Sequence, residues 1–465
     1  MVKIVHLVRK SYLMAAAFVF VAASGSNAQQ VPKLKFEKYT LANGLEVILH
    51  EDHSTPIVSV NTWFKVGSGD EKPGRTGFAH LFEHIMFMGS QHVPVGDFDK
   101  LLEAAGATNN GSTTEDRTNY YENVPSNALA LALWLDADRM GYLLPTMDRA
   151  KLDLQRDVVK NERRQSYDNV PYGLVDETIL KALYPKSHPY SWPVIGSMAD
   201  LSAASLDDVK DFFRTYYAPN NATISIAGDF DPKEVKGLIA RYFGPIPRGP
   251  KLPPRPSLAP IKIARDTFLV LEDKVQLPRM FYTWPTVKAY NSDEAPLDML
   301  AAVLASDKNS RLYKRLVYEL QTAQSVSAFQ QSGRLAGVFQ IDVLAKPGNK
   351  PAELDKVVRE EVQRIIASGI TARELERVKN SFRSRFLNQL ASIGGFGGKA
   401  NLLNQYNYGV GTPDYVQQDA ARYQRVTRAD VQRVARKYLS TPKIILTVVP
   451  EGKADLKLTS NGGDR

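Results

Sequence analysis

Two kinds of hydrophobic pattern follow one another along the chain. Short apolar or alternating runs predict β-strands at residues 45–53, 56–66, 222–228, 268–274, 278–285 and 444–449. Longer segments with apolar residues at helical spacing predict helices at residues 77–88, 127–142, 149–167, 206–217, 292–305, 351–368 and 371–392. Because hairpins and helices are mixed in both parts of the chain, the pattern indicates an α+β fold with largely antiparallel sheets.

The predicted elements repeat in order. Residues 45–66 and residues 268–285 each contain a β-rich run, an acidic turn, a proline and a second β-rich run with a Thr-Trp pair. This similarity predicts an internal duplication, in which two similar α/β-sandwich halves follow one another.

A proline-rich stretch separates the two halves. Seven prolines fall within the 18 residues from Phe243 to Pro260, where neither a helix nor a central strand can continue. We therefore expect halves at residues 34–243 and 263–452, joined by a semi-rigid linker at residues 244–262, with a disordered tail at residues 453–465.

The N-terminus is organised like a secretory signal peptide at residues 1–28. A basic segment up to Lys10 precedes an apolar run from Tyr12 to Ala23 and a small-residue cleavage site that ends at Ala28. The apolar run is too short to span a bilayer, so we expect cleavage near Ala28 and no stable membrane anchor. An exported chain without cysteine fits a bacterial periplasm better than a disulfide-rich extracellular setting.

Composition narrows the classes of function. A chain of 465 residues with 43% hydrophobic and 23% charged residues is typical of a globular protein, which excludes disordered and collagen-like classes. The formal net charge of +9 becomes +6 when Lys3, Arg9 and Lys10 leave with the signal peptide, and the remaining excess is spread along the chain. We therefore expect no nucleic-acid partner.

The absence of cysteine restricts any metal site to histidine and carboxylate ligands. The predicted helix at residues 77–88 contains His80-Leu-Phe-Glu83-His84. Residues i and i+4 lie on one face of a helix, so His80 and His84 can share one tetrahedral zinc ion, with Glu83 beside it to take a proton from water. This is the inverted zinc-peptidase motif. Structural histidines on a buried helix are the alternative, but a buried glutamate between them would be costly without a charged partner.

A catalytic zinc site takes three protein ligands and leaves one position for water. With no cysteine, the third ligand is a histidine, aspartate or glutamate. Glu162, on the charge-rich helix predicted at residues 149–167, is one of several candidates, because charges on a helix usually form a solvated face.

Taken together, these segments resemble the pitrilysin/insulinase-type zinc peptidases, especially the half-length branch that includes mitochondrial processing peptidase subunits and bacterial homologues. The resemblance extends from about Leu34 to Gly452. It rests on the segments at residues 77–89, 110–120, 158–162, 188–196 and 217–229.

The resemblance implies roles for individual residues. His80, His84 and Glu162 match the three ligands of one zinc ion per chain, and Glu83 matches the catalytic glutamate. The segment from Asn110 to Tyr120 matches the edge strand that pairs with the substrate backbone, a mode that tolerates many sequences. The residues expected to bind substrate are Asn110, Gly111, Ser112, Thr113 and Phe82. Phe82 is included because it lies beside the expected metal and could line the cleft, although such aromatic residues more often belong to the core.

The sequence departs from the family at two places. The family often has a second glutamate seven residues before the distal ligand, and here Gln155 can support the ligands by a hydrogen bond but adds no charge. Active members also use an arginine and a tyrosine from the C-terminal type of half, and the matching positions here are Val317 and Gln324.

These features predict a periplasmic zinc metalloendopeptidase that hydrolyses short or unfolded peptides. Half-length members build a clamshell chamber from two chains, so we expect a dimer, in which a homologous zinc-less chain supplies the arginine and tyrosine. The alternative is a non-catalytic scaffold, like the core subunits of larger assemblies, although those generally lose the zinc motif.

Overall fold

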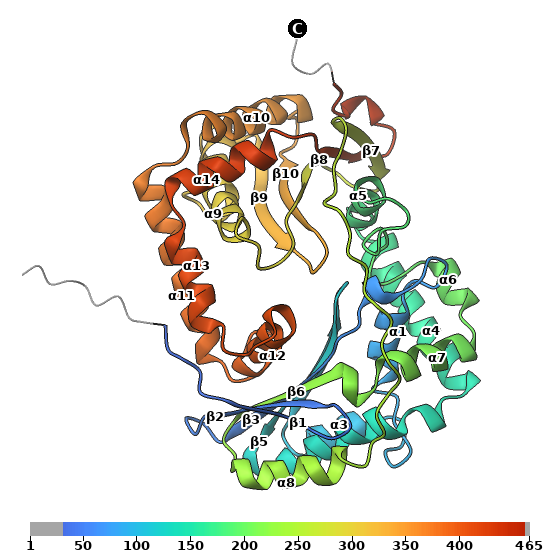
Figure 1. The fold of residues 1–465 in the computed structure, drawn as a ribbon. Coiled ribbons are helices and arrows are strands. Elements are labelled where there is room, and N and C mark those ends of the chain that lie inside the picture. Colours follow the sequence, from blue (N-terminus) through green and yellow to red (C-terminus); the bar gives the residue numbers. More distant parts are fainter. Residues whose placement is uncertain (1–30, 461–465) are drawn as a thin grey trace, which may run out of the picture.

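The computed structural model describes residues 31–460 and contains two β-sheets covered by helices (Figure 1). The signal peptide predicted at residues 1–28 lies outside the described residues. Within residues 31–460, none of the helices combines the length and the apolar character that crossing a bilayer requires. The α+β class with largely antiparallel sheets is confirmed.

The first sheet has six strands in the order β1-β2-β6-β3-β5-β4. Their bounds are β1 (Glu37–Thr40), β2 (Glu46–Glu51), β3 (Ile57–Phe64), β4 (Thr108–Thr113), β5 (Thr118–Pro125) and β6 (Ala222–Gly228). Only the β2–β6 pair is parallel. One face of this sheet is apolar and forms the core of the first half, with Val58, Val60 and Phe64 fully or almost fully buried.

The second sheet has five strands in the order β7-β11-β8-β10-β9. Their bounds are β7 (Thr267–Asp273), β8 (Arg279–Thr286), β9 (Ala323–Ser332), β10 (Gly337–Ala345) and β11 (Ile444–Pro450). This order equals β2-β6-β3-β5-β4 when β7 is matched to β2, and the parallel pair, β7–β11, stands at the matching place. The two halves therefore share one topology, as the duplicated pattern predicts.

Helices cover one face of each sheet and complete the two cores. The helices of the first half are α1 (Phe78–Ile85), α2 (Asp97–Ala104), α3 (Leu129–Tyr142), α4 (Arg149–Arg163), α5 (Val175–Leu183), α6 (Met198–Ala203), α7 (Leu206–Tyr216) and α8 (Pro232–Phe243). In the second half they are α9 (Glu294–Ala305), α10 (Pro351–Ser368), α11 (Ala372–Ala391), α12 (Lys399–Val410), α13 (Val416–Arg425) and α14 (Arg428–Val434).

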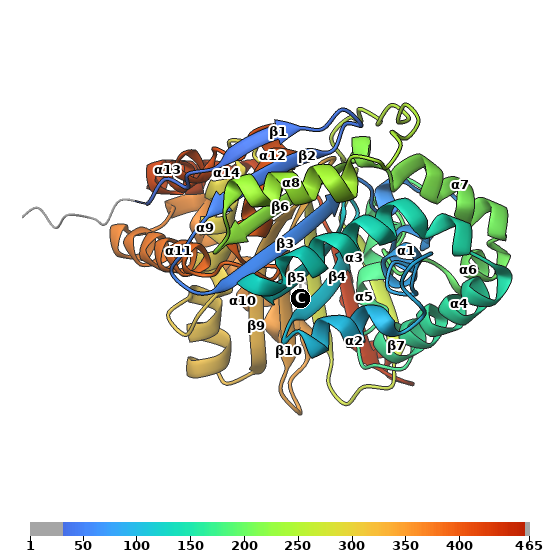
Figure 2. The same cartoon turned by 90° about the horizontal axis from the view of Figure 1, so that it is seen from below.

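Each half also contributes one helix to the free face of the other half's sheet. Helix α12 of the second half lies on β6 and β3 of the first sheet, and α5 of the first half lies on β11 of the second (Figures 1 and 2). The α5 contact is apolar, with Val175 and Ile179 packed against Phe281, Leu446 and Val448. The α12 contact is largely polar, through three asparagines described below, although Ile48 of β2 joins Leu402 and Leu403 of α12 in one apolar cluster.

The segment between Phe243 and β7 contains no helix or strand, in agreement with its prolines. It is held against both halves, because the Arg255 guanidinium pairs with Asp70 of the first half and donates to the hydroxyl of Tyr408 on α12 of the second.

The prediction of a disordered tail from residue 453 is wrong for residues 453–460, the part of the tail that the structure describes. A short 3-10 helix forms at Ala454–Leu456, and Leu458 packs into the second core, only 5% exposed. The apolar side chain of Leu458 fills a place beside β11, where the Leu458 amide donates to the Thr447 hydroxyl.

Candidate active site

Helix α1 begins at a glycine and a buried carboxylate. Gly77 has φ of 90°, a left-handed conformation that favours glycine, and the segment around Gly196 packs directly against it. The Glu71 carboxylate accepts the backbone N–H groups of Gly77 (2.9 Å) and Ala79 (2.8 Å). These bonds satisfy N–H groups that a helix leaves unpaired at its start, and they fix where α1 lies.

Helix α4 is capped at its start and is positioned relative to α1 by contacts at its other end. The Asp148 side chain caps its N-terminus by accepting from the Lys151 amide (2.8 Å). Near its C-terminus, Arg163 donates to the Gly196 carbonyl (2.7 Å) and to Glu177 (2.6 Å). The segment around Gly196 therefore contacts both helices, and it orients the last turn of α4 towards α1.

Three side chains from these two helices come together. Nε2 of His84 lies 3.1 Å from one oxygen of Glu162, and Nε2 of His80 lies 3.7 Å from the other. The three ligand atoms lie within 4.8 Å of one another. The structure thus brings together the two histidines and the carboxylate that the sequence and the family resemblance single out.

The charge states of these groups suit a divalent cation. Burial lowers the pKa of His80 to about 4, so its imidazole is neutral at pH 7. A hydrogen bond from His84 lowers the pKa of Glu162, so this carboxylate is ionised. Two imidazole nitrogens and one carboxylate oxygen make up a ligand set that catalytic zinc sites use.

Glu83 stands between this cluster and strand β4. Burial raises the pKa of Glu83 above its ordinary value, although the hydrogen bond from the Thr113 hydroxyl (2.6 Å) acts in the opposite direction. Strand β4 passes so close that a Cβ on Gly111 would lie 3.0 Å from Cγ of Glu83. The carboxylate is therefore confined beside the strand that precedes the β4–β5 turn.

Strand β4 is the last strand of the first sheet, so within residues 31–460 one of its edges has no neighbouring strand. The Thr114 N–H donates to the Arg117 carbonyl, so the next hydrogen-bonded pair is Ser112 with Asn119. The backbone groups of Gly111 and Thr113 then point to the open edge. Asn110 is exposed, and its side-chain oxygen accepts the Gly111 N–H (2.8 Å).

Phe82 does not face the ligand cluster or the open edge of β4, contrary to the expectation from sequence. Its side chain is 0% exposed and lies in the core of the first half, stacked on Phe212 and close to Tyr217. Phe82 sits on the side of α1 opposite to the histidines, where apolar burial stabilises it.

Gln155 does not contact the three ligands in this structure. Its amide nitrogen lies 2.7 Å from Sδ of Met88, and Nδ1 of His80 is buried without a hydrogen-bond partner among the described residues. The supporting hydrogen bond expected between Gln155 and the ligands is absent from this arrangement.

Sequence reasoning missed the residues that position the site rather than form it. Glu71 precedes α1 without a capping signature, and Arg163 looks like one more charge on a charged helix. A glycine at the helix start and a second glycine at residue 196 are the only signals of this packing in the sequence.

Two family descriptions match the chain. "Insulinase (Peptidase family M16)" matches residues 46–193, which contain the three residues of the cluster and Glu83, and "Peptidase M16 inactive domain" matches residues 203–382. The second match covers part of the half that has no His-x-x-Glu-His motif.

Known proteins and structures agree with these matches. The zinc protease PqqE of Helicobacter pylori is 29% identical over 437 residues, which cover 93% of this chain and 97% of that protein. A probable mitochondrial-processing peptidase subunit beta of Arabidopsis thaliana is 22% identical over 95% of this chain and 82% of its own length. The crystal structure of a protease from Helicobacter pylori has a TM-score of 0.80 and 26% identity, and it covers 90% of this chain and 100% of that one.

Proposed function

Because the chain belongs to the M16, or insulinase, family of peptidases, we propose that it is a zinc metalloendopeptidase that hydrolyses short or unfolded peptides. The observation that supports this most directly is the cluster of His80, His84 and Glu162 beside Glu83 and an open strand edge.

One zinc ion per chain fits the residues present. His80 and His84 would bind it through Nε2, the nitrogens that face Glu162, and Glu162 would bind it through its carboxylate. When bound, zinc supplies a Lewis acid that polarises the scissile carbonyl and makes water nucleophilic at neutral pH.

Glu83 is the proton carrier of the proposed reaction. Thr113 holds Oε2 of Glu83, and the carboxylate takes a proton from the attacking water and delivers it to the nitrogen of the departing amine. Burial raises the pKa of Glu83, which favours the protonated form that this group has between the two transfers.

The substrate backbone would pair with strand β4. Gly111 and Thr113 offer backbone groups at the open edge, so an extended peptide can add itself as a further strand with little demand on its sequence. Asn110 would release the Gly111 N–H to a carbonyl of the peptide. A side chain at position 111 would separate the peptide from Glu83, which explains why glycine stands there.

A second chain would complete the enzyme. Val317 packs against the second core and Gln324 is exposed on β9, so neither supplies the cation or the phenol that active relatives of this kind use. We propose that a homologous, zinc-less chain provides both groups and closes a chamber that excludes folded proteins. The processing-peptidase relative is itself described as a subunit.

The proposed location is the periplasm, reached by a signal peptide cleaved near Ala28. N-terminal sequencing of the chain recovered from a periplasmic extract tests this, and a chain that still begins at Met1 would contradict it.

Glu83→Gln is the variant that tests the function. With one zinc per chain bound, hydrolysis of a quenched fluorescent peptide should fall by at least about a hundredfold, because only the proton carrier is lost. Zinc content, measured by elemental analysis, should stay at the wild-type value. Glu103→Gln, at an exposed site on α2, is the matched control and should keep full activity.

The alternative is a non-catalytic scaffold, and the match of residues 203–382 to an inactive domain is the observation that favours it. A zinc-loaded wild-type chain that cleaves no member of a peptide library, alone or with its zinc-less partner, would favour the scaffold and refute the peptidase.

A further inference from the structure

Helix α12 of the second half meets the first sheet through three asparagines spaced three residues apart. Asn401, Asn404 and Asn407 are 7%, 1% and 5% exposed, and all three point at the sheet. Asn404 donates to the backbone carbonyl of Asn61 (2.7 Å), and Asn407 donates to Glu46 (3.2 Å). These two bonds reach β3 and β2, whereas Asn401 reaches β5, the strand paired with β4.

The orientation of the Asn401 amide is fixed by its partners. Its Nδ2 donates to the Phe396 carbonyl (2.7 Å), in the glycine-rich turn between α11 and α12. Its Oδ1 accepts from the indole N–H of Trp63 (2.9 Å), a group that can only donate. The oxygen therefore faces the sheet, where it also accepts from Nδ2 of Asn119 (3.1 Å).

This acceptor in turn fixes Asn119, which is 0% exposed on β5. With Nδ2 directed to Asn401, Oδ1 of Asn119 faces strand β4 and accepts from the Ser112 hydroxyl (2.6 Å) and the Arg117 guanidinium (2.7 Å). Arg117 also donates to the Ser112 carbonyl (2.8 Å). If Asn119 turned over, its amide N–H groups would face the Arg117 cation, the bond from Arg117 would be lost, and the Ser112 hydroxyl would have to accept instead of donate.

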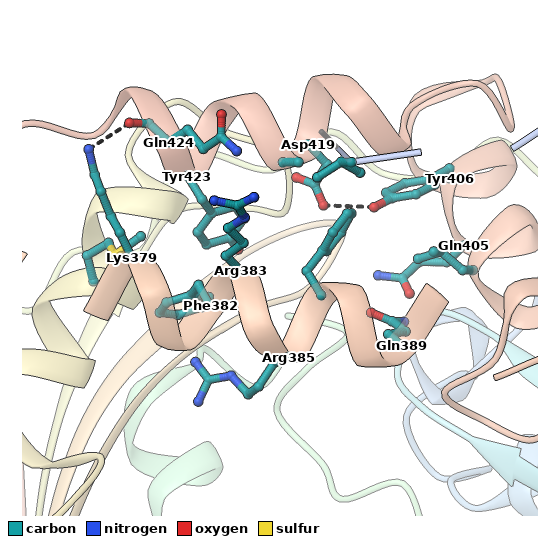
Figure 3. Close-up of a pocket in the computed structure, with 15 residues that line it drawn as sticks. Lys379, Phe382, Arg383, Arg385, Gln389, Gln405, Tyr406, Asp419, Tyr423 and Gln424 are labelled. Atoms are coloured by element: carbon teal, nitrogen blue, oxygen red, sulfur yellow. Dashed lines mark hydrogen bonds between the residues drawn. The ribbon is translucent and has the colours of Figure 1, made fainter. Parts of the chain in front are cut away.

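Helix α12 is braced on its other side, so Asn401 reaches the sheet from a fixed position. The Tyr406 hydroxyl donates to Asp419 of α13 (2.9 Å), and α11 and α13 enclose a pocket of about 280 Å³ beside α12 (Figure 3). In front of the sheet, the ring of Phe396 lies edge-on to Tyr121 of β5, with ring centres 4.9 Å apart.

We propose that Asn401 is a positioning residue for the substrate-binding strand, supplied by the half that has no metal motif. It orients Asn119, which holds Ser112 and Arg117 and thereby keeps β4 where Thr113 reaches Glu83. This role deepens the proposed function and rests on it. The second half then does more than enclose the site, because it sets the place of the strand edge on which a peptide would pair.

Hydrogen exchange tests the positioning without any need for activity. In the zinc-loaded chain, Asn401→Leu should speed amide exchange in residues 108–113 by about tenfold, the effect of losing one buried hydrogen bond. Asn404→Leu is the matched control, since it removes an equally buried asparagine of the same helix whose partner is on β3; it should leave exchange in residues 108–113 unchanged. Asn401→Asp keeps the acceptor that Trp63 and Asn119 need but loses the donor to the Phe396 carbonyl, so it should speed exchange in residues 108–113 less than Asn401→Leu does.

Kinetics tests the consequence for substrate. Asn401→Leu should raise KM for a peptide by about tenfold, with kcat within about threefold of the wild-type value. The reason is that part of the free energy of peptide binding would be used to order strand β4. If Asn401→Leu does not fold, Asn401→Ser can replace it, because the shorter side chain moves the oxygen away from Asn119. Both measurements, hydrogen exchange in residues 108–113 and KM for a peptide, are then made on Asn401→Ser.

The two proposals fail in different ways. Equal exchange in β4 for Asn401→Leu and Asn404→Leu, or equal changes in KM, would overturn the positioning role. Faster exchange in β4 for Asn401→Leu alone, in a protein that cleaves no peptide even with its zinc-less partner, would support the positioning role and refute the peptidase.

Discussion

The hydrogen bond from Thr113 to Glu83 joins the strand edge to the carboxylate that would carry the proton. Thr113→Val keeps the shape of the side chain but removes the hydroxyl, so one oxygen of a largely buried carboxylate loses its partner. We expect kcat to fall by about tenfold, with zinc content unchanged.

Thr113→Ser is the matched variant because it keeps the hydroxyl. Its kcat should stay within about twofold of the wild-type value. Equal losses in the valine and serine variants would show that the methyl group matters and that the hydrogen bond does not.

At the same scale, helical geometry explains which parts of the site are visible in the sequence. His80 and His84 are one turn apart, so their spacing reports a shared face directly. Phe82 lies about 200° around the helix from His80, which places it on the opposite face; the same periodicity that finds the ligands predicts its burial. Glu162 is different, because nothing in a single sequence says which charged residue of a distant helix packs on α1.

Among the elements, the approach of β4 to α1 depends on a residue without a side chain. In Gly111→Ala the new methyl group would lie 3.0 Å from Glu83 and 3.3 Å from both Phe87 and Tyr120, so the strand or these side chains must shift by a few tenths of an ångström. We expect kcat/KM to fall by at least about tenfold while zinc stays bound.

Gly237→Ala, in helix α8, provides the control, since a methyl group there meets nothing within 4 Å. It should leave activity unchanged and raise stability slightly, because alanine favours a helix. Full activity in Gly111→Ala would show that the strand and Glu83 are not held at a critical distance.

The start of helix α1 makes stability depend on pH. Burial raises the pKa of Glu71 from 4.5 to about 8, although the two backbone N–H groups at the helix start act against this. Between these values the folded chain binds more protons than the unfolded chain, so the free energy of unfolding falls as pH rises from 4.5 to 8.

Urea denaturation at pH 5, 6.5 and 8 measures this slope. Glu71→Gln cannot titrate, so its stability should change less with pH than that of the wild type, although it is lower at pH 5 because one acceptor of an N–H group is lost. Identical slopes in the two proteins would mean that Glu71 is ionised throughout.

Most strands and helices could be predicted from the hydrophobic pattern, and their order revealed the duplication. The Thr-Trp pair that both halves contain was a misleading sign of this duplication, however. Trp63 faces α12, whereas Trp284 lies in the second core, so the two Thr-Trp pairs present opposite faces of matching strands. A shift of one residue reverses the face of a strand, and a short motif cannot report such a shift. The asparagines of α12 were equally invisible, because their partners on the first sheet are more than 180 residues away.

At the scale of the whole molecule, the missing arginine and tyrosine predict that the chain is a weak enzyme alone. Adding a homologous zinc-less chain that has both residues should raise kcat/KM by at least about tenfold, since each supplies a hydrogen bond to the substrate. An adjacent reading frame that encodes such a chain is the first place to look. A purified chain that forms a homodimer and cleaves peptides at full rate would contradict this prediction.

The two cross-packing helices respond differently to temperature. Burial of apolar surface by α5 is favoured by entropy near 25 °C and weakens on cooling. The contact of α12 depends on hydrogen bonds, whose favourable enthalpy is opposed by the entropy of ordering the groups that make them. Heating would therefore separate α12 from the first sheet first, while α5 still holds the halves together, and cooling would first separate α5 from the second sheet. The strand edge beside Glu83 is connected to the α12 contact, so heating would affect it first.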